Sequence, residues 1–243
     1  MNPIRFITIS ALTILITACG QPEEPVSPTD PEPEDTMDFA SNEPSLREAT
    51  SDAGSPDPAS GIDKTDPLWK LNVIEPPVQS FEPGQTYFWV LNTNKGTMRF
   101  RLLHESAPTH VSHLIHLTRI GFYDGTIFHR AVKGFMAQGG DPIGNGTGGP
   151  GYRIDLEIDP ALSHTRGILS TANTGRPTSD GSQFFIMYET SEFLDGKYSI
   201  FGELVSGMET LAAFEAVSNQ FDGPPTEPLK LMTASIEVES ANP

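Results

Sequence analysis

The sequence has one cysteine, few basic residues, and no hydrophobic run beyond its N-terminus that is long enough to cross a membrane. A single cysteine excludes a disulfide within the chain, so the folded part must be held by packing and hydrogen bonds. Only 15 Lys and Arg stand against 32 Asp and Glu, and the formal net charge is −17. This balance, without a basic cluster, argues against a nucleic-acid partner, and we expect none.

The one long apolar run follows Arg5 and occupies residues 6–16. It is too short to span a bilayer as a mature helix, and its position is typical of a signal peptide. Residues 16–20, ITACG, resemble the end of a bacterial lipoprotein signal, in which Cys19 would become lipidated. We therefore assign residues 1–18 to a lipoprotein signal peptide; a plain secretory signal, discarded together with Cys19, is the alternative. Gly20 at the next position favours anchoring in the bacterial cell envelope, at the periplasmic face of the outer membrane.

Residues 19–66 have the composition of a disordered tether. From position 20 onward this segment holds eight Pro, thirteen Asp or Glu and only two basic residues. Large apolar side chains are nearly absent, so burial cannot offset the entropy lost on ordering. A spacer between the anchor and a folded domain is the simplest interpretation. An interaction tail for basic partners is the alternative.

Order is expected to begin near residue 67. Residues 67–86 include Trp69, Val73 and Phe81, which predicts an N-terminal extension packed on the outside of the following domain. A partner-binding segment is the alternative interpretation of the same residues. From residue 87 to residue 240 the pattern becomes regular, and we assign this part to one folded domain.

The sequence pattern of this domain predicts short strands and two helices. We expect strands at residues 87–91 and 97–103, a helix from Pro108 to Gly121, a helix at about 207–217 and a last strand at 229–238. The first helix would bury Val111, Leu114, Ile115 and Thr118, and the second Met208, Leu211, Ala212 and Phe214. The prediction is a mostly β fold, a closed eight-stranded antiparallel β-barrel capped by two α-helices.

Three histidines, His110, His113 and His116, stand three apart on the first expected helix. This spacing makes a divalent-metal site conceivable. No cysteine or acidic residue joins them at ligand spacing, so we expect solvated or locally hydrogen-bonded histidines. We predict no metal and no other cofactor.

The most informative stretch is residues 126–151, TIFHRAVKGFMAQGGDPIGNGTGGPG. Its first seven residues favour a strand that carries Phe128 and Arg130 on one face and His129 on the other. The dense glycines that follow predict a loop. Arg130 close to Phe135 and Met136 suggests a shallow apolar pocket with a cationic donor at its rim. The alternative is that Phe135 and Met136 are core and Arg130 is a surface charge.

Further blocks follow in order: GILSTAN at 167–173, GSQFFI at 181–186 and FLDGKYSIFG at 193–202. With FHR at 128–130 and GFMAQGGD at 134–141, they make residues 87–238 resemble a cyclophilin-type peptidyl-prolyl cis-trans isomerase. The resemblance implies a barrel fold, no cofactor, and Pro-containing polypeptides of the envelope as clients. We expect a monomer.

Rotation about an X–Pro bond breaks no bond, so it requires a site complementary to the twisted amide rather than a nucleophile or a metal. The resemblance makes Arg130 the donor to the prolyl nitrogen. It also implies substrate-binding roles for a larger set. The proline slot would comprise Phe135, Met136, Phe185 and Leu194; the peptide backbone would be held by Gln138, Asn173 and Gln183; and Gly146 and Ala172 would allow its close approach.

Three residues at the implied site depart from the commonest family pattern. Phe193 stands where many eukaryotic members have Trp, and Tyr198 where they have His, while Thr174 replaces a usual Ala. Because Phe193 lacks the indole N–H, we predict weakened cyclosporin binding with isomerase activity retained. Two other function classes remain open. One is a chaperone or binding module for Pro-containing segments with little isomerase activity, and the other is an envelope scaffold that recruits partners through its acidic tether.

Overall fold

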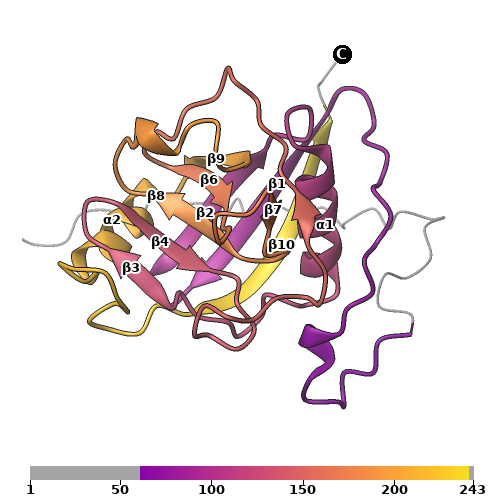
Figure 1. Ribbon diagram of the computed structural model, residues 1–243, viewed down its shortest axis with the longest axis horizontal. Coiled ribbons are helices and arrows are strands. Elements are labelled where there is room, and N and C mark those ends of the chain that lie inside the picture. The colour runs from indigo at the N-terminus through magenta and orange to yellow at the C-terminus, as the bar shows by residue number, and fades with distance from the viewer. Residues whose placement is uncertain (1–60, 241–243) are drawn as a thin grey trace, which may run out of the picture. The chain divides into compact units, whose positions relative to one another are not determined.

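The computed structural model describes residues 61–240, so the predicted signal peptide, Cys19 and most of the tether lie outside the described residues (Figure 1). Among the described residues, no helix combines the length and the hydropathy needed to cross a bilayer. The two α-helices are α1 (Pro108–Arg119) and α2 (Met208–Ala216). The strands are β1 (Gln85–Thr93), β2 (Gly96–Leu102), β3 (Arg130–Val132), β4 (Met136–Gly139), β5 (Ile154–Asp155), β6 (Ile168–Thr171), β7 (Thr178–Ser179), β8 (Phe184–Met187), β9 (Ile200–Ser206) and β10 (Leu231–Ser240). Two short 3-10 helices are η1 (Trp69–Leu71) and η2 (Glu192–Leu194).

Eight of the strands form one antiparallel sheet in the order β10-β1-β2-β9-β6-β8-β4-β3, and β5 pairs with β7. The mostly β fold with eight antiparallel strands and two helices is confirmed. The closed barrel is wrong, because β10 and β3 are the two ends of the sheet and do not pair with each other. Near these ends the chain makes isolated bridges instead, with the N–H of Phe128 donating to Leu229 O at 3.0 Å and that of Leu231 to Thr126 O at 2.9 Å.

The strand expected at residues 126–132 is shorter, because β3 begins only at Arg130. The backbone N–H of Phe128 is used on the segment before β10, and the Phe128 ring packs in the interior, 4.9 Å from that of Phe214. Arg130 lies on the outer face with Gln138. The prediction that Phe128 and Arg130 share a face is therefore wrong.

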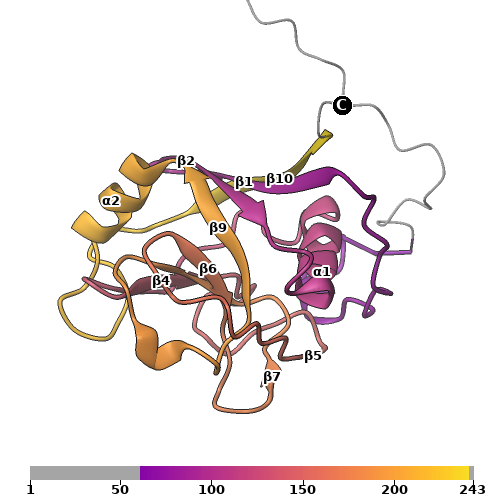
Figure 2. The ribbon, with the colours of Figure 1, turned by 90° about the horizontal axis from the view of Figure 1, so that it is seen from above.

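The interior of the sheet is filled by aromatic side chains. Trp89 is fully buried and makes edge contacts with Tyr123 at 5.1 Å and Phe184 at 4.9 Å between ring centroids. The two helices lie at opposite ends of the sheet (Figures 1 and 2). This core is what holds β3, β4 and β8 in register, because burial of large aromatic side chains is the main stabilising contribution of such an interior.

Helix α1 buries Val111, Leu114, Ile115 and Thr118, as predicted. For α2 the prediction is half wrong, because Leu211 and Phe214 are buried while Met208 and Ala212 are exposed. At about 100° per residue, the buried Thr210 shares a face with Leu211 and Phe214, and Met208 and Ala212 fall on the opposite side. Met208, Leu211, Ala212 and Phe214 are all apolar, so residue type alone did not show which of them the helix buries.

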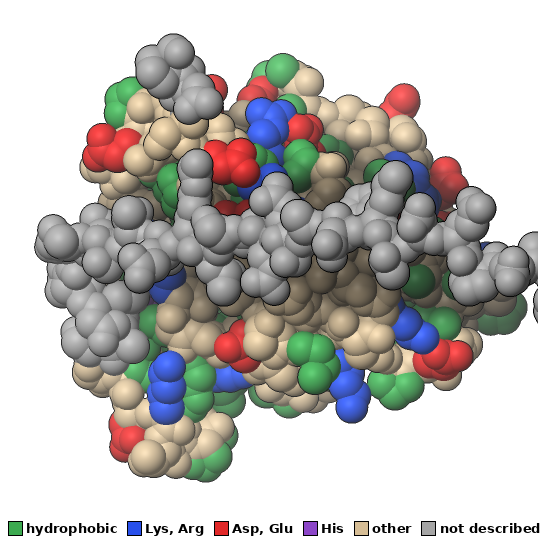
Figure 3. Space-filling model, turned by 180° about the vertical axis from the view of Figure 1, so that it is seen from behind, with side chains coloured by type: hydrophobic (Ala, Val, Ile, Leu, Met, Phe, Trp, Pro, Cys, Tyr) green, Lys and Arg blue, Asp and Glu red, His purple; other side chains and the backbone are tan. Residues whose placement is uncertain are grey.

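Residues 61–84 run along α1, where the N–H of Gln79 donates to Ser112 Oγ at 2.8 Å (Figure 2). The N–H of Val73 donates to Pro150 O at 2.9 Å, and the Trp69 ring lies edge-on to Phe122 at 6.3 Å. On the surface shown in Figure 3, blue Lys and Arg side chains and red Asp and Glu side chains are both scattered over the part that the grey atoms leave visible.

The α1 histidines were expected to be solvated or locally hydrogen-bonded; His110 and His113 are not solvated, because both are buried. Glu157, from the loop after β5, reaches the N-terminus of α1, where its carboxylate accepts the N–H groups of Thr109 at 2.9 Å and His110 at 3.0 Å. Glu157 Oε2 also lies 2.6 Å from His110 Nδ1. Carboxylates are favoured at this position because the first N–H groups of a helix have no partner within it.

Glu157→Gln should remove a pH-dependent part of the stability. Burial alone would raise the pKa of Glu157, but the hydrogen bonds from the His110 ring and from the backbone at Thr109 and His110 outweigh it and lower this pKa to about 2. A depressed folded-state pKa gives stability that is present above the unfolded-state value and is lost as the pH falls through the folded-state value. Urea midpoints from pH 7 to pH 2 should therefore separate wild type from the variant at neutral pH and converge near the acid end. A constant separation would contradict this account.

Candidate functional site

The outer face of the sheet carries a line of functional side chains on three neighbouring strands. Arg130 on β3 lies opposite Gln138 on β4, and Gln138 lies opposite Phe185 on β8. Because side chains alternate along a strand, Met136 and Gln138 project outward while Ala137 enters the interior core. The register thus brings together residues that are up to 55 positions apart.

An apolar cluster separate from the interior core forms the floor of this face. Its buried members are Met136, Ile168, Ala172, Phe185, Met187, Leu194 and Ile200. Phe135 and Tyr198 are partly buried and pack against it. Met136, Phe185 and Leu194, predicted for the proline slot, therefore lie together. Met136 is buried, as the alternative interpretation expects, but it belongs to this second cluster and not to the interior core that holds Ala137.

Aromatic side chains form the walls. Phe193 is 64% exposed and stacks on Phe135, with 5.9 Å between centroids and 26° between planes. Tyr198 meets Phe185 edge-on at 5.6 Å. An exposed aromatic stacked on a second one presents a large apolar surface at little entropic cost on binding, because each ring has few rotatable bonds.

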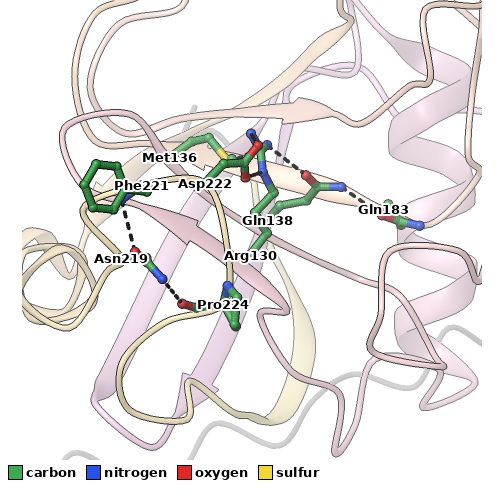
Figure 4. A network of polar contacts seen from close by, with 8 residues as sticks. All are labelled: Arg130, Met136, Gln138, Gln183, Asn219, Phe221, Asp222 and Pro224. Carbon is green, nitrogen blue, oxygen red and sulfur yellow. Dashed lines mark hydrogen bonds and ion pairs between the residues drawn. The ribbon is translucent and has the colours of Figure 1, made fainter.

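Arg130 sits at the rim of the cluster, with its side chain 33% exposed. Its Nε and Nη2 donate to the two carboxylate oxygens of Asp222, at 2.5 and 3.1 Å (Figure 4). The remaining nitrogen, Nη1, lies 3.9 Å from Met136 Sδ and 3.4 Å from Gln138 Oε1. The hydrogen bonds from Arg130 hold the pKa of Asp222 below its ordinary value. One nitrogen of the guanidinium is thus directed over the apolar floor.

Two glutamine amides continue this network away from Arg130. Gln138 Nε2 donates to Gln183 Oε1 at 2.9 Å, and Gln183 Nε2 donates to Gly146 O at 3.1 Å and Gly148 O at 2.8 Å. Gly146 has a φ of +90°, a conformation that a residue with a side chain rarely adopts. Gln183 spends both N–H groups on this loop and is buried, whereas Gln138 is half-buried and keeps one N–H group and one oxygen lone pair.

The glycine-rich loop that bears Gly146 is organised by a buried carboxylate. Asp141 Oδ1 accepts the N–H of Ile143 at 2.7 Å, and Oδ2 accepts that of Asn145 at 2.9 Å and that of Gly146 at 2.5 Å. Burial would raise the pKa of Asp141, but these backbone donors outweigh it and hold the pKa below its ordinary value. The loop is therefore held in one shape at neutral pH.

The remaining predicted residues, Ala172, Asn173 and Thr174, directly follow β6. Asn173 Nδ2 donates to Lys197 O at 3.1 Å, and Asn173 Oδ1 accepts the N–H of Gly175 at 2.8 Å. Asn173 thus braces a turn, while Ala172 is buried beside it and Thr174 is exposed. The turn interpretation of Asn173 and a substrate contact are compatible, because an amide oxygen has two lone pairs.

Sequence reasoning missed three residues around the site: His164, Asp195 and Asp222. Below the floor, the buried His164 ring stacks on Phe185 at 6.0 Å, its Nδ1 lies 2.7 Å from Asp195 Oδ1 and its Nε2 lies 3.1 Å from Ser170 Oγ. Asp195 directly follows Leu194, so this pair ties the slot to the sheet. Asp195 lay within a recognised block, whereas Asp222 had no signal, because it is 92 positions from its partner Arg130.

No group of three or more His, Cys, Asp and Glu side chains within residues 61–240 is arranged to hold a metal ion. The face carries one guanidinium, several amides and an apolar floor. Groups of these kinds are able to orient an extended peptide and to donate hydrogen bonds to it.

Residues 88–236 match the family described as cyclophilin type peptidyl-prolyl cis-trans isomerase/CLD. "Peptidyl-prolyl cis-trans isomerase-like 1" of Gibberella zeae is 43% identical over 154 residues, which are 62% of this chain and 94% of that protein. A "Peptidyl-prolyl cis-trans isomerase" of Helicobacter pylori is 43% identical over 130 residues, covering 53% and 79%. A solved Cryptosporidium parvum cyclophilin-type isomerase, crystallised in the presence of the dipeptide Ala-Pro, matches with a TM-score of 0.59 and 38% identity, covering 62% of this chain and 98% of that one.

Proposed function

The chain belongs to the cyclophilin-type peptidyl-prolyl cis-trans isomerase family and is an isomerase of X–Pro bonds, and we propose that Arg130 is its catalytic donor. The barrier to rotation is about 18–20 kcal/mol, because amide resonance is lost in the twisted state. In that state the prolyl nitrogen becomes pyramidal and gains a lone pair that accepts a hydrogen bond. A donor held at that nitrogen stabilises the twisted amide more than either planar form, which is the requirement for catalysis.

The observation that carries this proposal is the direction of Arg130 Nη1. Asp222 engages the other two nitrogens, and Nη1 lies over Met136 at the rim of the apolar cluster. A proline ring seated on Met136, Phe185 and Leu194 would bring its nitrogen toward that donor. The slot is apolar, so the hydrogen bond forms where water competes less strongly.

The flanking peptide must be held so that one end stays fixed while the other turns. Gln138 and Asn173 each keep one N–H group and one oxygen lone pair for the peptide backbone, while Gln183, with both N–H groups bonded to the glycine-rich loop, holds Gln138 in place. Gly146 and Ala172 leave room for that backbone to approach. The side chains of Phe193, Tyr198 and Thr174 then border the substrate and influence which X–Pro sequences fit.

Phe193→Trp should strengthen inhibition by cyclosporin while changing isomerase activity little. Phe193 is exposed and stacked on Phe135, so an indole at this position fits without entering the core and adds one N–H donor. One additional hydrogen bond corresponds to a decrease in the inhibition constant of about tenfold. The check is a cyclosporin titration of both proteins, with Met232→Trp, at an exposed position on β10, as the control for added aromatic surface. Nanomolar inhibition of the wild type would contradict the role given to the missing indole.

For the cell, we place this isomerase in the bacterial envelope, where it would act on exported proteins. The proposal rests on the apolar run at residues 6–16, on Cys19 at its end and on the acidic, Pro-rich segment that follows. A lipid on Cys19 would hold the domain at the membrane. The acidic tether would keep it away from anionic headgroups and within reach of emerging chains.

Metabolic labelling with a radioactive fatty acid tests this placement in a two-membrane bacterium that expresses the full chain. Wild type should incorporate label and fractionate with outer membranes, while Cys19→Ser should remain unlabelled and uncleaved. Soluble, unlabelled wild-type protein in the periplasm would overturn the anchor and favour the plain secretory signal. Deletion of residues 20–60 separates a spacer from a scaffold, because only a scaffold would lose partners that co-purify with the chain.

A further inference from the structure

The segment Asn219 to Pro224, here called the flank loop, is bound along the free edge of β3. The N–H of Ala131 donates to Gly223 O at 3.0 Å, that of Asn219 to Ala131 O at 2.9 Å and that of Lys133 to Asn219 O at 2.8 Å. β3 is the last strand of the sheet, so these bonds satisfy an edge that would otherwise be unpaired. The flank loop is thereby fixed to the strand that carries Arg130.

The flank loop is also held from within by one side chain. Asn219 Nδ2 donates to Pro224 O at 3.1 Å, and Asn219 Oδ1 accepts the N–H of Phe221 at 3.0 Å (Figure 4). An asparagine that bonds the backbone on both sides of a turn fixes its shape. The two residues at the tip, Phe221 and Asp222, are therefore presented in a defined orientation.

The tip of the flank loop presents a carboxylate that binds Arg130, from Asp222, and an exposed aromatic ring, from Phe221. The Asp222 carboxylate accepts hydrogen bonds from two nitrogens of Arg130. This two-point pairing fixes both the position and the plane of a guanidinium. Phe221, next to it, is 80% exposed. A single exposed aromatic is common on protein surfaces. This one is distinguished by its attachment to a braced loop and by its adjacency to the residue that holds Arg130.

We propose that the flank loop is a substrate-recognition element, in which Asp222 is a positioning residue for Arg130 and Phe221 is the wall of a subsite. The subsite would take an apolar or aromatic side chain of the bound polypeptide, at the end of the substrate that points away from Gln183. This rests on the donor role proposed for Arg130. The amides of Gln138 and Gln183 occupy one side of Arg130 and the flank loop the other, so the two ends of an extended peptide meet different chemistry.

The two parts of the flank loop should affect different kinetic constants. Asp222 is 71% exposed, so solvent screens its charge and its main effect is on the orientation of the guanidinium. If the guanidinium of Arg130 is no longer oriented toward the prolyl nitrogen, kcat should fall for every substrate. Phe221 contacts only substrates with a suitable flanking side chain, so its loss changes selectivity and leaves the simplest peptide unaffected.

The experiment is a protease-free solvent-jump assay of the full-length protein with three peptides of equal length. One peptide has Ala on both sides of an Ala-Pro bond, one has Phe before that bond and one has Phe after it. Wild type should prefer one Phe peptide, and Phe221→Ala should remove about fivefold of kcat/KM for that peptide only. Met232→Ala, an exposed apolar residue on the opposite edge strand β10, is the control for general surface hydrophobicity.

Asp222→Asn should lower kcat about fivefold for all three peptides with little change in KM, and Asp222→Glu should restore most of it. Glu227→Gln, which breaks the exposed ion pair with Lys95 at 2.6 Å, is the matched control. An Asp222→Asn protein as fast as wild type, or a Phe221→Ala protein with unchanged selectivity, would overturn the inference. If either of these results is found while wild type is active and Arg130→Ala is inactive, the role of Arg130 as donor still stands. If Arg130→Ala is itself active, the donor role is refuted.

Discussion

Arg130→Ala should lower kcat/KM for an Xaa-Pro peptide by a factor of about 10² to 10³, the usual loss when one preorganised donor to a transition state is removed. The variant keeps the apolar floor and the amides of Gln138 and Gln183, so peptide binding should change much less than turnover. The polar contacts of the Arg130 side chain, with Asp222, Gln138 and Met136, all lie on the outer face of the sheet, so the fold should stay intact. A coupled-protease isomerisation assay measures the effect.

Two controls make this result interpretable. Circular dichroism of Arg130→Ala should match wild type, and Arg130→Lys should recover little activity, because an ammonium group cannot bond Asp222 with two nitrogens and still present a third. A variant with wild-type kcat/KM would refute Arg130 as the donor. A wild type that binds peptide without turnover would favour the binding module considered from the sequence.

Gly140→Ala should be strongly destabilising. Gly140 follows β4 with a φ of +81°, and a Cβ there would lie 2.3 Å from Ser182 O and 2.8 Å from Phe184 Cδ1. A backbone carbonyl and a buried ring cannot both move away, so we expect a loss of about 2–4 kcal/mol from strain and overpacking together. The displaced segment also carries Gln183, so activity should fall as well. Urea denaturation measures the loss.

Gly125→Ala is the matched control, because Gly125 has a similar φ of +75° but no atom within 4 Å of the added Cβ. This variant should lose about 1 kcal/mol, from backbone strain alone. Equal losses at the two positions would show that the close contact at Gly140 relaxes, and would remove the packing argument.

Much of the site was predictable because its residues fall in short blocks with recognisable order. Arg130, Phe135, Met136 and Gln138 lie within nine positions, and the pairing of β3 with β4 brings them to one face. Asp222 and Phe221 were not predictable, because nothing in the composition of their loop places it beside Arg130, which it meets through backbone bonds to β3 and the Asp222 carboxylate. Likewise, Glu157 joins His110 across 47 positions.

The sequence by itself determined the family, the mostly β fold, the two helices and three members of the apolar cluster, Met136, Phe185 and Leu194, because each depends on local pattern or on ordered motifs. Only the tertiary structure decided that β10 and β3 leave the sheet open, which face of α2 is buried, and which carboxylate holds Arg130. These features depend on contacts between distant segments, whose geometry is set by packing of the whole core rather than by any neighbouring residues.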